Sequence, residues 1–480
     1  MSANYIRWLI IFRLRESRLP KWVGEYNLSD SSSEFSFNNP PGMIPFVLKQ
    51  QKEEDPDVVR GYEDLWAYAV RFYGLYPRLL NRWYYAFGIY ESIMHFLYSY
   101  YVVSYSISII IAVPYKDTGL TATLICLGVM TLIYFIVAHN FIYRRELVDM
   151  MFKIVGQGFF KYERPLTDGE KDILKKADVR CKKNFYFYNS LAVGAAFLTC
   201  VITPAVHALQ GKPPSTVVEG GVPVNSNLPL PIYLPWGTET HLKYWLTSVV
   251  MIQNGCWEAG VICSACGLYC NLCTRFNAQL SLLSYSLRDL ENRALYMYES
   301  KGRTKKDNDE EHYNDPIFHE CMNYCLNENI KHHVVLMKFY QILQNTVSLA
   351  IFGIFSGTAL QSSAPMFQLL SVVEKGEIDE IILTGLVFLS NCLANLTILA
   401  SYCLYGQEVT DASDEVNSAF YETQWLCADQ SFKRKILICQ AMTMQPFILW
   451  AMGLISASSA TLMDILKTSF SYVNLLLATL

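Results

Sequence analysis

The sequence is poor in charge. Lys, Arg, Asp and Glu together make up 17% of its 480 residues, whereas 52% are hydrophobic. Soluble domains are about a quarter charged, so this composition excludes an ordinary soluble protein of this length. The net charge of −4 argues against a nucleic-acid partner, which would attract a basic surface.

Motifs of catalysis are missing as well. The sequence shows no Ser/His/acid or Cys/His arrangement with local support, and no phosphate-binding glycine loop. It also lacks the Asp/Glu-Arg-Tyr and Asn-Pro-x-x-Tyr motifs that are usual in G-protein-coupled receptors. We therefore expect neither an enzyme nor a cofactor.

What the sequence has instead is a series of long apolar runs. Seven of them reach the roughly 20 residues that a helix needs to span a bilayer. They lie at about 87–113, 119–143, 184–209, 244–270, 341–371, 379–405 and 447–480. These runs predict an all-α membrane protein with seven transmembrane helices.

The basic residues are distributed unevenly around these runs. Of the 39 Lys and Arg, 34 lie before the first run or in the connections that follow the second, fourth and sixth runs. Four lie in the connections that follow the first, third and fifth runs, and Lys467 lies inside the last run. Because cytoplasmic loops carry an excess of Lys and Arg, the N-terminus is expected in the cytoplasm and the C-terminus outside. A G-protein-coupled receptor has the reverse orientation.

Two segments outside the runs, 274–299 and 411–443, mix apolar and charged residues at helical spacing, as amphipathic helices do. Together with the runs, they divide the chain into six regions. The expected regions are a cytoplasmic N-terminal region with an interfacial or re-entrant helix (1–86), transmembrane helices 1–4 (87–273), cytoplasmic helical extensions with a charged linker (274–340), transmembrane helices 5–6 (341–405), a cytoplasmic anchor helix (406–446) and transmembrane helix 7 (447–480).

Four cysteines in the fourth run, Cys263, Cys266, Cys270 and Cys273, form two Cys-x-x-Cys pairs. On a helix they share one face, and about 15 Å of helix separates the first from the last. Tetrahedral zinc needs every sulfur about 2.3 Å from one ion, which a straight helix cannot provide. We therefore predict thiols that pack against a neighbouring helix, and no metal site.

Ionisable residues inside the apolar runs are costly and usually have a role. Glu258 lies in the middle of the fourth run, where a structural contact between helices and a function are equally compatible with the sequence. Asp464 and Lys467 are one turn apart in the last run and can pair. By contrast, His332 and His333 precede the fifth run and are expected to be solvated or to cap a helix.

The last run has two different faces when it is projected on a helix. One stripe is small, polar or ionic over most of its length: Gly453, Ala457, Ala460, Asp464, Lys467, Ser471, Leu475 and Ala478. The opposite side carries Leu454, Ile455, Leu462, Ile465 and Leu466. Such a stripe can face a packed bundle, or it can line a pore between several copies, with Leu475 as an apolar constriction. Projection alone leaves both possibilities open.

Several segments resemble the insect odorant receptors. They are LPLPIYLPWGTETHLKYWLT at 228–247, YG at 405–406, SAFYETQW at 418–425, FKRKILI at 432–438, Pro446 and ILKTSFSY at 465–472. The related gustatory receptors usually carry a short Thr-Tyr and Gln-Phe signature near the C-terminus, which is absent here. A gustatory-type channel and a G-protein-coupled receptor stay as alternatives.

The resemblance implies an odorant-gated, non-selective cation channel in the plasma membrane of olfactory sensory neurons, surrounded by membrane lipid. Four subunits would meet through their cytoplasmic anchor helices, and the last helix of each would line the pore, with its gate at Leu475 and Ala478. The family's shared coreceptor has a glutamine-like residue where Ala478 stands, and a long cytoplasmic insertion that this chain lacks. The resemblance therefore implies a ligand-tuned subunit that assembles with the coreceptor or with copies of itself.

The same resemblance places an odorant pocket in the outer half of each subunit, among spans two, three, four and six. By depth it implies Thr123, Cys126, Met130, Phe197, Val201, Thr203, Ser248, Met251, Ile252, Thr384 and Phe388 as ligand-binding residues. These side chains are mostly apolar or aromatic with a few hydroxyls, and none is charged. The expected ligand is a small neutral volatile held by shape and dispersion.

Overall fold

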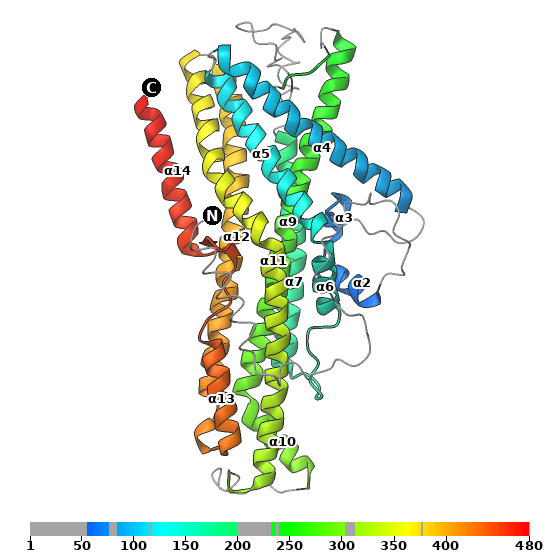
Figure 1. Ribbon diagram of the computed structural model, residues 1–480, viewed down its shortest axis with the longest axis vertical. Coiled ribbons are helices and arrows are strands. Elements are labelled where there is room, and N and C mark those ends of the chain that lie inside the picture. The colour runs from blue at the N-terminus through cyan, green and yellow to red at the C-terminus, as the bar shows by residue number, and fades with distance from the viewer. Residues whose placement is uncertain are drawn as a thin grey trace, which may run out of the picture. The chain divides into compact units, whose positions relative to one another are not determined.

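The computed structural model describes residues 55–75, 84–115, 118–198, 228, 232–236, 240–302, 313–375 and 378–479, apart from some side chains in the helices. Helices make up nearly all of this part, and they run side by side along most of their length (Figure 1).

Each of the seven predicted spans lies at least in part on a helix of the described residues. These helices are α4 (Tyr84–Ala112), α5 (Thr118–Tyr143), α7 (Asp168–Ala196), α9 (His241–Arg288), α11 (Pro316–Lys375), α12 (Ile378–Glu422) and α14 (Ser459–Thr479). Within the described residues, three helical segments are long and apolar enough to cross a membrane by themselves, namely Ser92–Ala112, Leu242–Arg288 and Pro316–Thr358. A fourth candidate is α5 taken together with α6 (Arg145–Gly156), which bends away from it by 67°.

Three of the helices are much longer than a bilayer is thick. The 48 residues of α9, the 60 of α11 and the 45 of α12 correspond to about 70 to 90 Å of helix, against a hydrocarbon core of about 30 Å. Their ends therefore extend into a second packed region, where α10 (Leu290–Ser300) and α13 (Gln430–Thr443) join them (Figure 1). We call residues 274–302, 313–340 and 406–446 the lower bundle.

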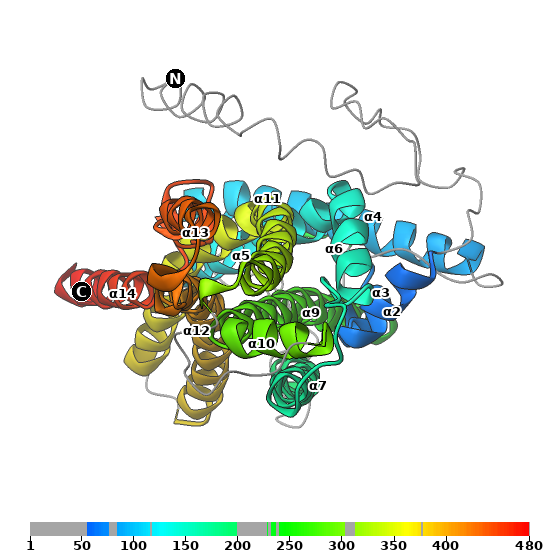
Figure 2. The same cartoon turned by 90° about the horizontal axis from the view of Figure 1, so that it is seen from below.

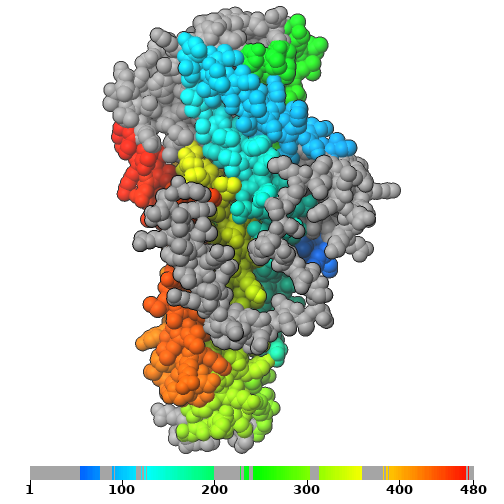
Figure 3. Space-filling view, in the orientation of Figure 1, coloured from blue at the N-terminus to red at the C-terminus, as the bar shows by residue number. Residues whose placement is uncertain are grey.

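The lower bundle differs in two respects from the sequence-based expectation. Segment 274–299 is divided at Asp289, because α9 ends at Arg288 and α10 begins at Leu290. Segment 411–443 is not a single helix: α12 ends at Glu422, a short 3-10 turn follows at Trp425–Cys427, and α13 begins at Gln430. Asp429 caps α13, because its carboxylate accepts a hydrogen bond from the backbone N–H of Phe432 at 3.1 Å. Figure 3 shows α13 exposed beside α10 and the beginning of α11.

Helix α9 lies at the centre of the packing. It contacts α7, α12, α11 and α5, and the view from below shows α7, α11 and α12 around it (Figure 2). Cys263, Cys266, Cys270 and Cys273 on α9 are at most 3% exposed, and the thiol of Cys270 lies 3.2 Å from the hydroxyl of Tyr188 on α7. That hydroxyl also donates a hydrogen bond to Ser401 on α12. The prediction of thiols packed between helices is confirmed.

Before the first span, α2 (Pro56–Asp64) and α3 (Tyr68–Phe72) are the short helices described within the predicted N-terminal region. Asp55 caps α2 by accepting a hydrogen bond from the backbone N–H of Asp57 at 3.0 Å, and Pro56 occupies the first helical position, where no N–H is needed. Helix α2 packs along α6.

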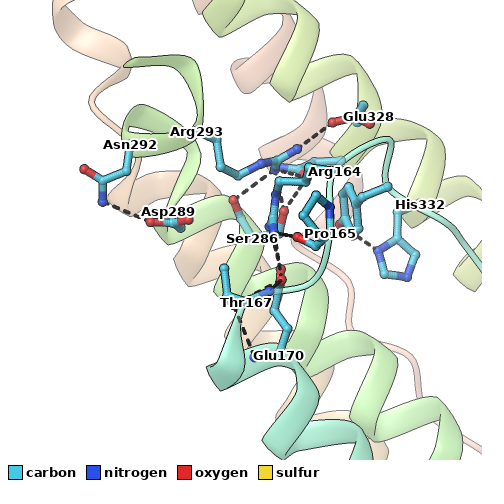
Figure 4. Close-up of polar contacts among 12 residues, drawn as sticks. Arg164, Pro165, Thr167, Glu170, Ser286, Asp289, Asn292, Arg293, Glu328 and His332 are labelled. Atoms are coloured by element: carbon cyan, nitrogen blue, oxygen red, sulfur yellow. Dashed lines mark hydrogen bonds and ion pairs between the residues drawn. The ribbon is translucent and has the colours of Figure 1, made fainter. Parts of the chain in front are cut away.

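A polar cluster holds the connection between α6 and α7 against the lower bundle (Figure 4). The guanidinium group of Arg293 on α10 is buried and donates to Glu328 at 2.6 Å and to Asn329 at 3.0 Å, both on α11. Glu328 in turn accepts a hydrogen bond from the backbone N–H of Glu163 in the connection. The buried charge is thus paired and hydrogen-bonded, as its burial requires.

The same connection starts α7. Glu170 is fully buried and accepts two hydrogen bonds from Arg164, at 2.6 and 2.8 Å. It also completes a capping box with Thr167, the residue that precedes α7. Burial raises the pKa of Glu170, but the hydrogen bonds from Arg164 and from the Thr167 backbone outweigh that effect and hold the pKa below its ordinary value.

The expectation for the histidine pair is wrong. His332 is fully buried, stacks on Phe160 with ring centroids 5.2 Å apart, and has Nδ1 2.9 Å from the hydroxyl of Tyr162. His333 is half-buried and stacks on Phe447. Because the contacting residues are distant in the sequence, local pattern could not indicate this burial.

Candidate ligand site and pore helix

A β-hairpin precedes the last helix. Strands β1 (Trp450–Ala451) and β2 (Ile455–Ser456) pair antiparallel, and the turn between them contains Gly453 at φ +71°, a conformation that glycine adopts without strain. The predicted helix over 447–480 is therefore wrong at its start, since α14 begins only at Ser459. The small residues Gly453 and Ala457 do not belong to the helical stripe.

Side chains of α11 replace the helical hydrogen bonds that the hairpin lacks. The amide of Gln344 donates to the carbonyl oxygen of Trp450 at 2.9 Å and accepts from its N–H at 2.8 Å. Ser348, one turn further along α11, accepts a hydrogen bond from the N–H of Met452. On the other side, Gly406 of α12 lies so close to the chain that a Cβ there would come within 2.5 Å of the carbonyl oxygen of Ala457. The hairpin is thus fixed between α11 and α12.

The polar edge of α14 points away from its own subunit. Leu462 and Ile465 pack against the core, whereas Asp464, Lys467 and Ser471 are exposed. In the described part of the chain, Asp464 and Lys467 form no ion pair with each other, so the pairing considered from their spacing is not observed. The gate candidates Leu475 and Ala478 lie on the same helix, but their side chains are outside the described part.

The residues implied for the odorant pocket are described only in part. Val201 and Thr203 lie outside the described residues, and so do the side chains of Thr123, Cys126, Thr384 and Phe388. Of the others, Ser248 and Met251 are buried, Met130 and Ile252 are half-buried, and Phe197 at the end of α7 is exposed.

Met251 lies in an apolar cluster between α9 and two neighbouring helices. The cluster joins Met251 and Tyr244 of α9 to Tyr101 and Tyr105 of α4 and to Leu124 of α5. Two residues of the connection before α9, Leu228 and Ile232, complete it. The structure therefore brings Met251 together with α4, a helix that the resemblance did not include in the pocket.

Polar side chains lie on the same face of α9, seven residues further along the helix. Glu258 accepts hydrogen bonds through Oε1 from Asn254 at 2.8 Å and from Thr131 of α5 at 3.3 Å. The ring centroid of Tyr98 on α4 lies 5.0 Å from that of Trp257, the residue before Glu258. Thr131, Asn254 and Tyr98 were not candidates from the sequence; the position of Glu258 inside an apolar run was the only signal.

The fold agrees with the comparison to known families. A family model described as 7tm odorant receptor matches residues 118–470 of the chain. The chain therefore belongs to the odorant receptor family. As a member, it is a multi-pass membrane protein and not an enzyme, and its all-α fold with seven membrane helices is the fold of the family.

Curated relatives come from Drosophila melanogaster. Odorant receptor 33a is 26% identical over 151 residues, which is 32% of this chain and 38% of that protein. Odorant receptor 2a is 23% identical over 200 residues, 42% of this chain and 48% of that protein. Odorant receptor 85b is 22% identical over 255 residues, 53% of this chain and 57% of that protein. The chain thus spans between 38% and 57% of the length of these relatives.

Two solved structures are similar in fold. The insect olfactory receptor OR5 from Machilis hrabei in complex with eugenol gives a TM-score of 0.69 at 14% identity, covering 88% of this chain and 100% of that one. The structure of OR5 reported without mention of a ligand gives 0.68 at 15% identity, with 89% and 100% covered. At this level of identity the likeness establishes the fold.

Proposed function

We propose that the chain is a subunit of an odorant-gated, non-selective cation channel whose pore is lined by α14. One observation carries the proposal: Asp464, Lys467 and Ser471 lie on the exposed edge of α14, while Leu462 and Ile465 attach its other face to the subunit. Exposed ionisable groups on a helix of a membrane protein are costly against lipid and favourable against water. An aqueous axis shared by several subunits provides that water.

Assembly through the lower bundle fits the surface of α13. Leu437, Ile438 and Met442 are exposed on this helix, and Met444 follows them. Next to them, a groove of about 490 Å³ opens between α12 and α13, lined by Asn417, Ser418, Tyr421, Glu422, Gln440 and Met444. Apolar side chains gathered on a polar helix are typical of contact surfaces. We propose a tetramer whose subunits meet here, formed with a coreceptor or with copies of this chain.

The chain is proposed to be the ligand-tuned subunit, active in the plasma membrane of olfactory sensory neurons. Ala478 stands where the coreceptor has a polar residue, and the long cytoplasmic insertion of the coreceptor is absent. The proposed ligand is a small volatile that reaches the outer half of the helices. The structure of the similar Machilis receptor is a complex with eugenol, which is a small volatile molecule.

Gating is proposed to be a shift between two populations, closed and open. A ligand that binds the open arrangement better moves the equilibrium by its difference in affinity for the two states. The β-hairpin is the connection through which this shift would reach α14, because Gln344 of α11 and Gly406 of α12 both contact it. In the closed state, the Leu475 side chains would keep the pore dry.

Electrical recording from cells that express the chain, alone and with the coreceptor, against a panel of volatiles tests this function. Replacing Leu475 by Ser should raise the ligand-free current, because a hydroxyl ring wets more easily than an apolar one. Leu462→Ser, on the face packed against the core, serves as the control and should not raise it. Unchanged basal and evoked currents in Leu475→Ser would contradict the proposed gate.

A further inference from the structure

Glu258 has a hydrogen-bonding environment that the pore and the hairpin do not use. Only its Oε1 atom receives the hydrogen bonds from Asn254 and Thr131, and both donors are neutral groups. Glu258 is only half-buried, although Asn254 and Thr131 are each 2% exposed. Among the described residues, no hydrogen bond reaches the other carboxyl oxygen of Glu258, Oε2.

Two further polar atoms near this carboxyl group are buried without a partner. They are Oδ1 of Asn254 and the hydroxyl of Tyr98, which have no hydrogen bond within the described part of the chain. Tyr98 is fully buried, and its ring packs edge-on against that of Trp257, the residue before Glu258. A polar group buried without a partner is unfavourable unless something else bonds it. Together they offer a hydroxyl that can donate, and two oxygen acceptors in the amide and the carboxyl group.

The apolar cluster continues directly from this polar group. Met251 lies seven residues before Glu258, on the same face of α9, and packs with Tyr101 of α4. An occupant that reaches Glu258 along this face would therefore have an apolar body beside Met251 and a polar end beside Glu258. Metal ions are poor candidates, since no three His, Cys, Asp or Glu side chains of the described residues meet as ligands.

We propose that Glu258, Asn254 and Tyr98 form the polar end of a binding site between α4, α5 and α9 that selects hydroxylated odorants, alcohols and phenols. The ligand hydroxyl donates its hydrogen to Asn254 Oδ1 or to the free carboxyl oxygen of Glu258, and its oxygen accepts from Tyr98. Ethers and ketones cannot donate, so they leave the acceptors unbonded. This inference rests on the proposed function, because it names the ligand class of the same receptor.

The test compares 2-phenylethanol, its methyl ether and 2-phenylethylamine on cells that express the chain with the coreceptor. A site that hydrogen-bonds a ligand strongly rejects the analogue that lacks the group. The alcohol should therefore act at a concentration about tenfold or more below that of the ether. Glu258→Leu removes an acceptor that only the alcohol can use, so it should raise the half-maximal concentration of the alcohol and leave that of the ether unchanged. Tyr98→Phe removes a donor from which either ligand oxygen can accept, so it should raise both.

Gln253→Leu is the matched control, because Gln253 lies on α9 with an exposed side chain; it should leave both responses as they are. Equal effects of Glu258→Leu on alcohol and ether, or no effect of Tyr98→Phe on either, would overturn the proposal. A preference for the amine that Glu258→Leu abolishes would also overturn it, in favour of a cation site.

A second readout does not need a current. Because a ligand that binds the folded state stabilises it, 2-phenylethanol should raise the unfolding temperature of the purified protein more than its methyl ether does, and Glu258→Leu should remove that difference. Equal shifts with alcohol and ether in the natural chain overturn the site. If no volatile evokes a current but the alcohol stabilises the protein through Glu258, the channel function fails and the site stands.

Discussion

Gly61 of α2 and Gly156 of α6 bring the two helices into backbone contact. A Cβ at Gly61 would lie 1.8 Å from the carbonyl oxygen of Phe152, and a Cβ at Gly156 would lie 1.8 Å from that of Asp57. Both positions are helical, so glycine is present for the close approach and not for a turn. This contact attaches the segment before the first span to the helix that follows the second.

Gly61→Ala should separate α2 from α6. Overpacking of this kind typically costs about 1 to 3 kcal/mol, so the unfolding temperature of the purified protein should fall by several degrees. Gly194→Ala on α7 is the control: no atom lies within 4 Å of its Cβ position, and alanine is the better helix former. Similar unfolding temperatures for Gly61→Ala and the natural chain would show that the glycine contact is not required.

Gly406→Ala should disturb gating more than assembly. The added methyl group would push the chain at Ala457 away from α12 and so loosen the hairpin, while the exposed surface of α13 stays unchanged. We expect normal amounts of protein at the cell surface but a reduced maximal odorant current. Gly353→Ala is the control, because its Cβ would make only an ordinary contact with Ile133 at 3.6 Å. A full current in Gly406→Ala would remove the hairpin from the coupling route.

Glu170 should make the fold sensitive to acid. Its pKa is held below the ordinary value in the folded chain, so its contribution to stability is complete above the ordinary value and is lost as the pH falls through the folded pKa. Glu170→Gln breaks the buried pair with Arg164 and should cost about 3 kcal/mol at pH 7. The difference from the natural chain should shrink at pH 3.

Thermal unfolding of the purified protein at both pH values checks this prediction. Asp168→Asn is the control, since Asp168 is fully exposed in its pair with Lys171, and exposed pairs contribute little. A Glu170→Gln deficit that is equally large at pH 3 would assign the effect to packing instead of charge.

The spans and the packed cysteines were predictable because they depend on local properties. A run of about 20 apolar residues, and residues of one kind that recur every three or four positions, can both be recognised from residues that are close in the sequence. The environment of His332 depends on Phe160 and Tyr162, which precede it by about 170 residues, and no local pattern reports such a contact.

The hairpin before α14 was missed for a related reason. Residues 450–456 are apolar enough to continue the last run, and helical projection assumes that the helix is uninterrupted. What ends it is the amide of Gln344, which satisfies both backbone groups of Trp450, together with the close approach that Gly406 permits. The part of the stripe from Asp464 to Ser471 lies inside α14, so helical projection was valid for these residues.

The central claim is that the exposed edge of α14 faces water along a pore. Substituting Ser471 by Cys and applying a charged, water-soluble methanethiosulfonate reagent during odorant stimulation tests it most directly, with Leu462→Cys on the packed face as the control and the natural chain correcting for native cysteines. The account predicts that the reagent irreversibly changes the current through Ser471→Cys channels and leaves Leu462→Cys channels unaffected. A Ser471→Cys current that no reagent alters, in channels that still open to odorant, would contradict it.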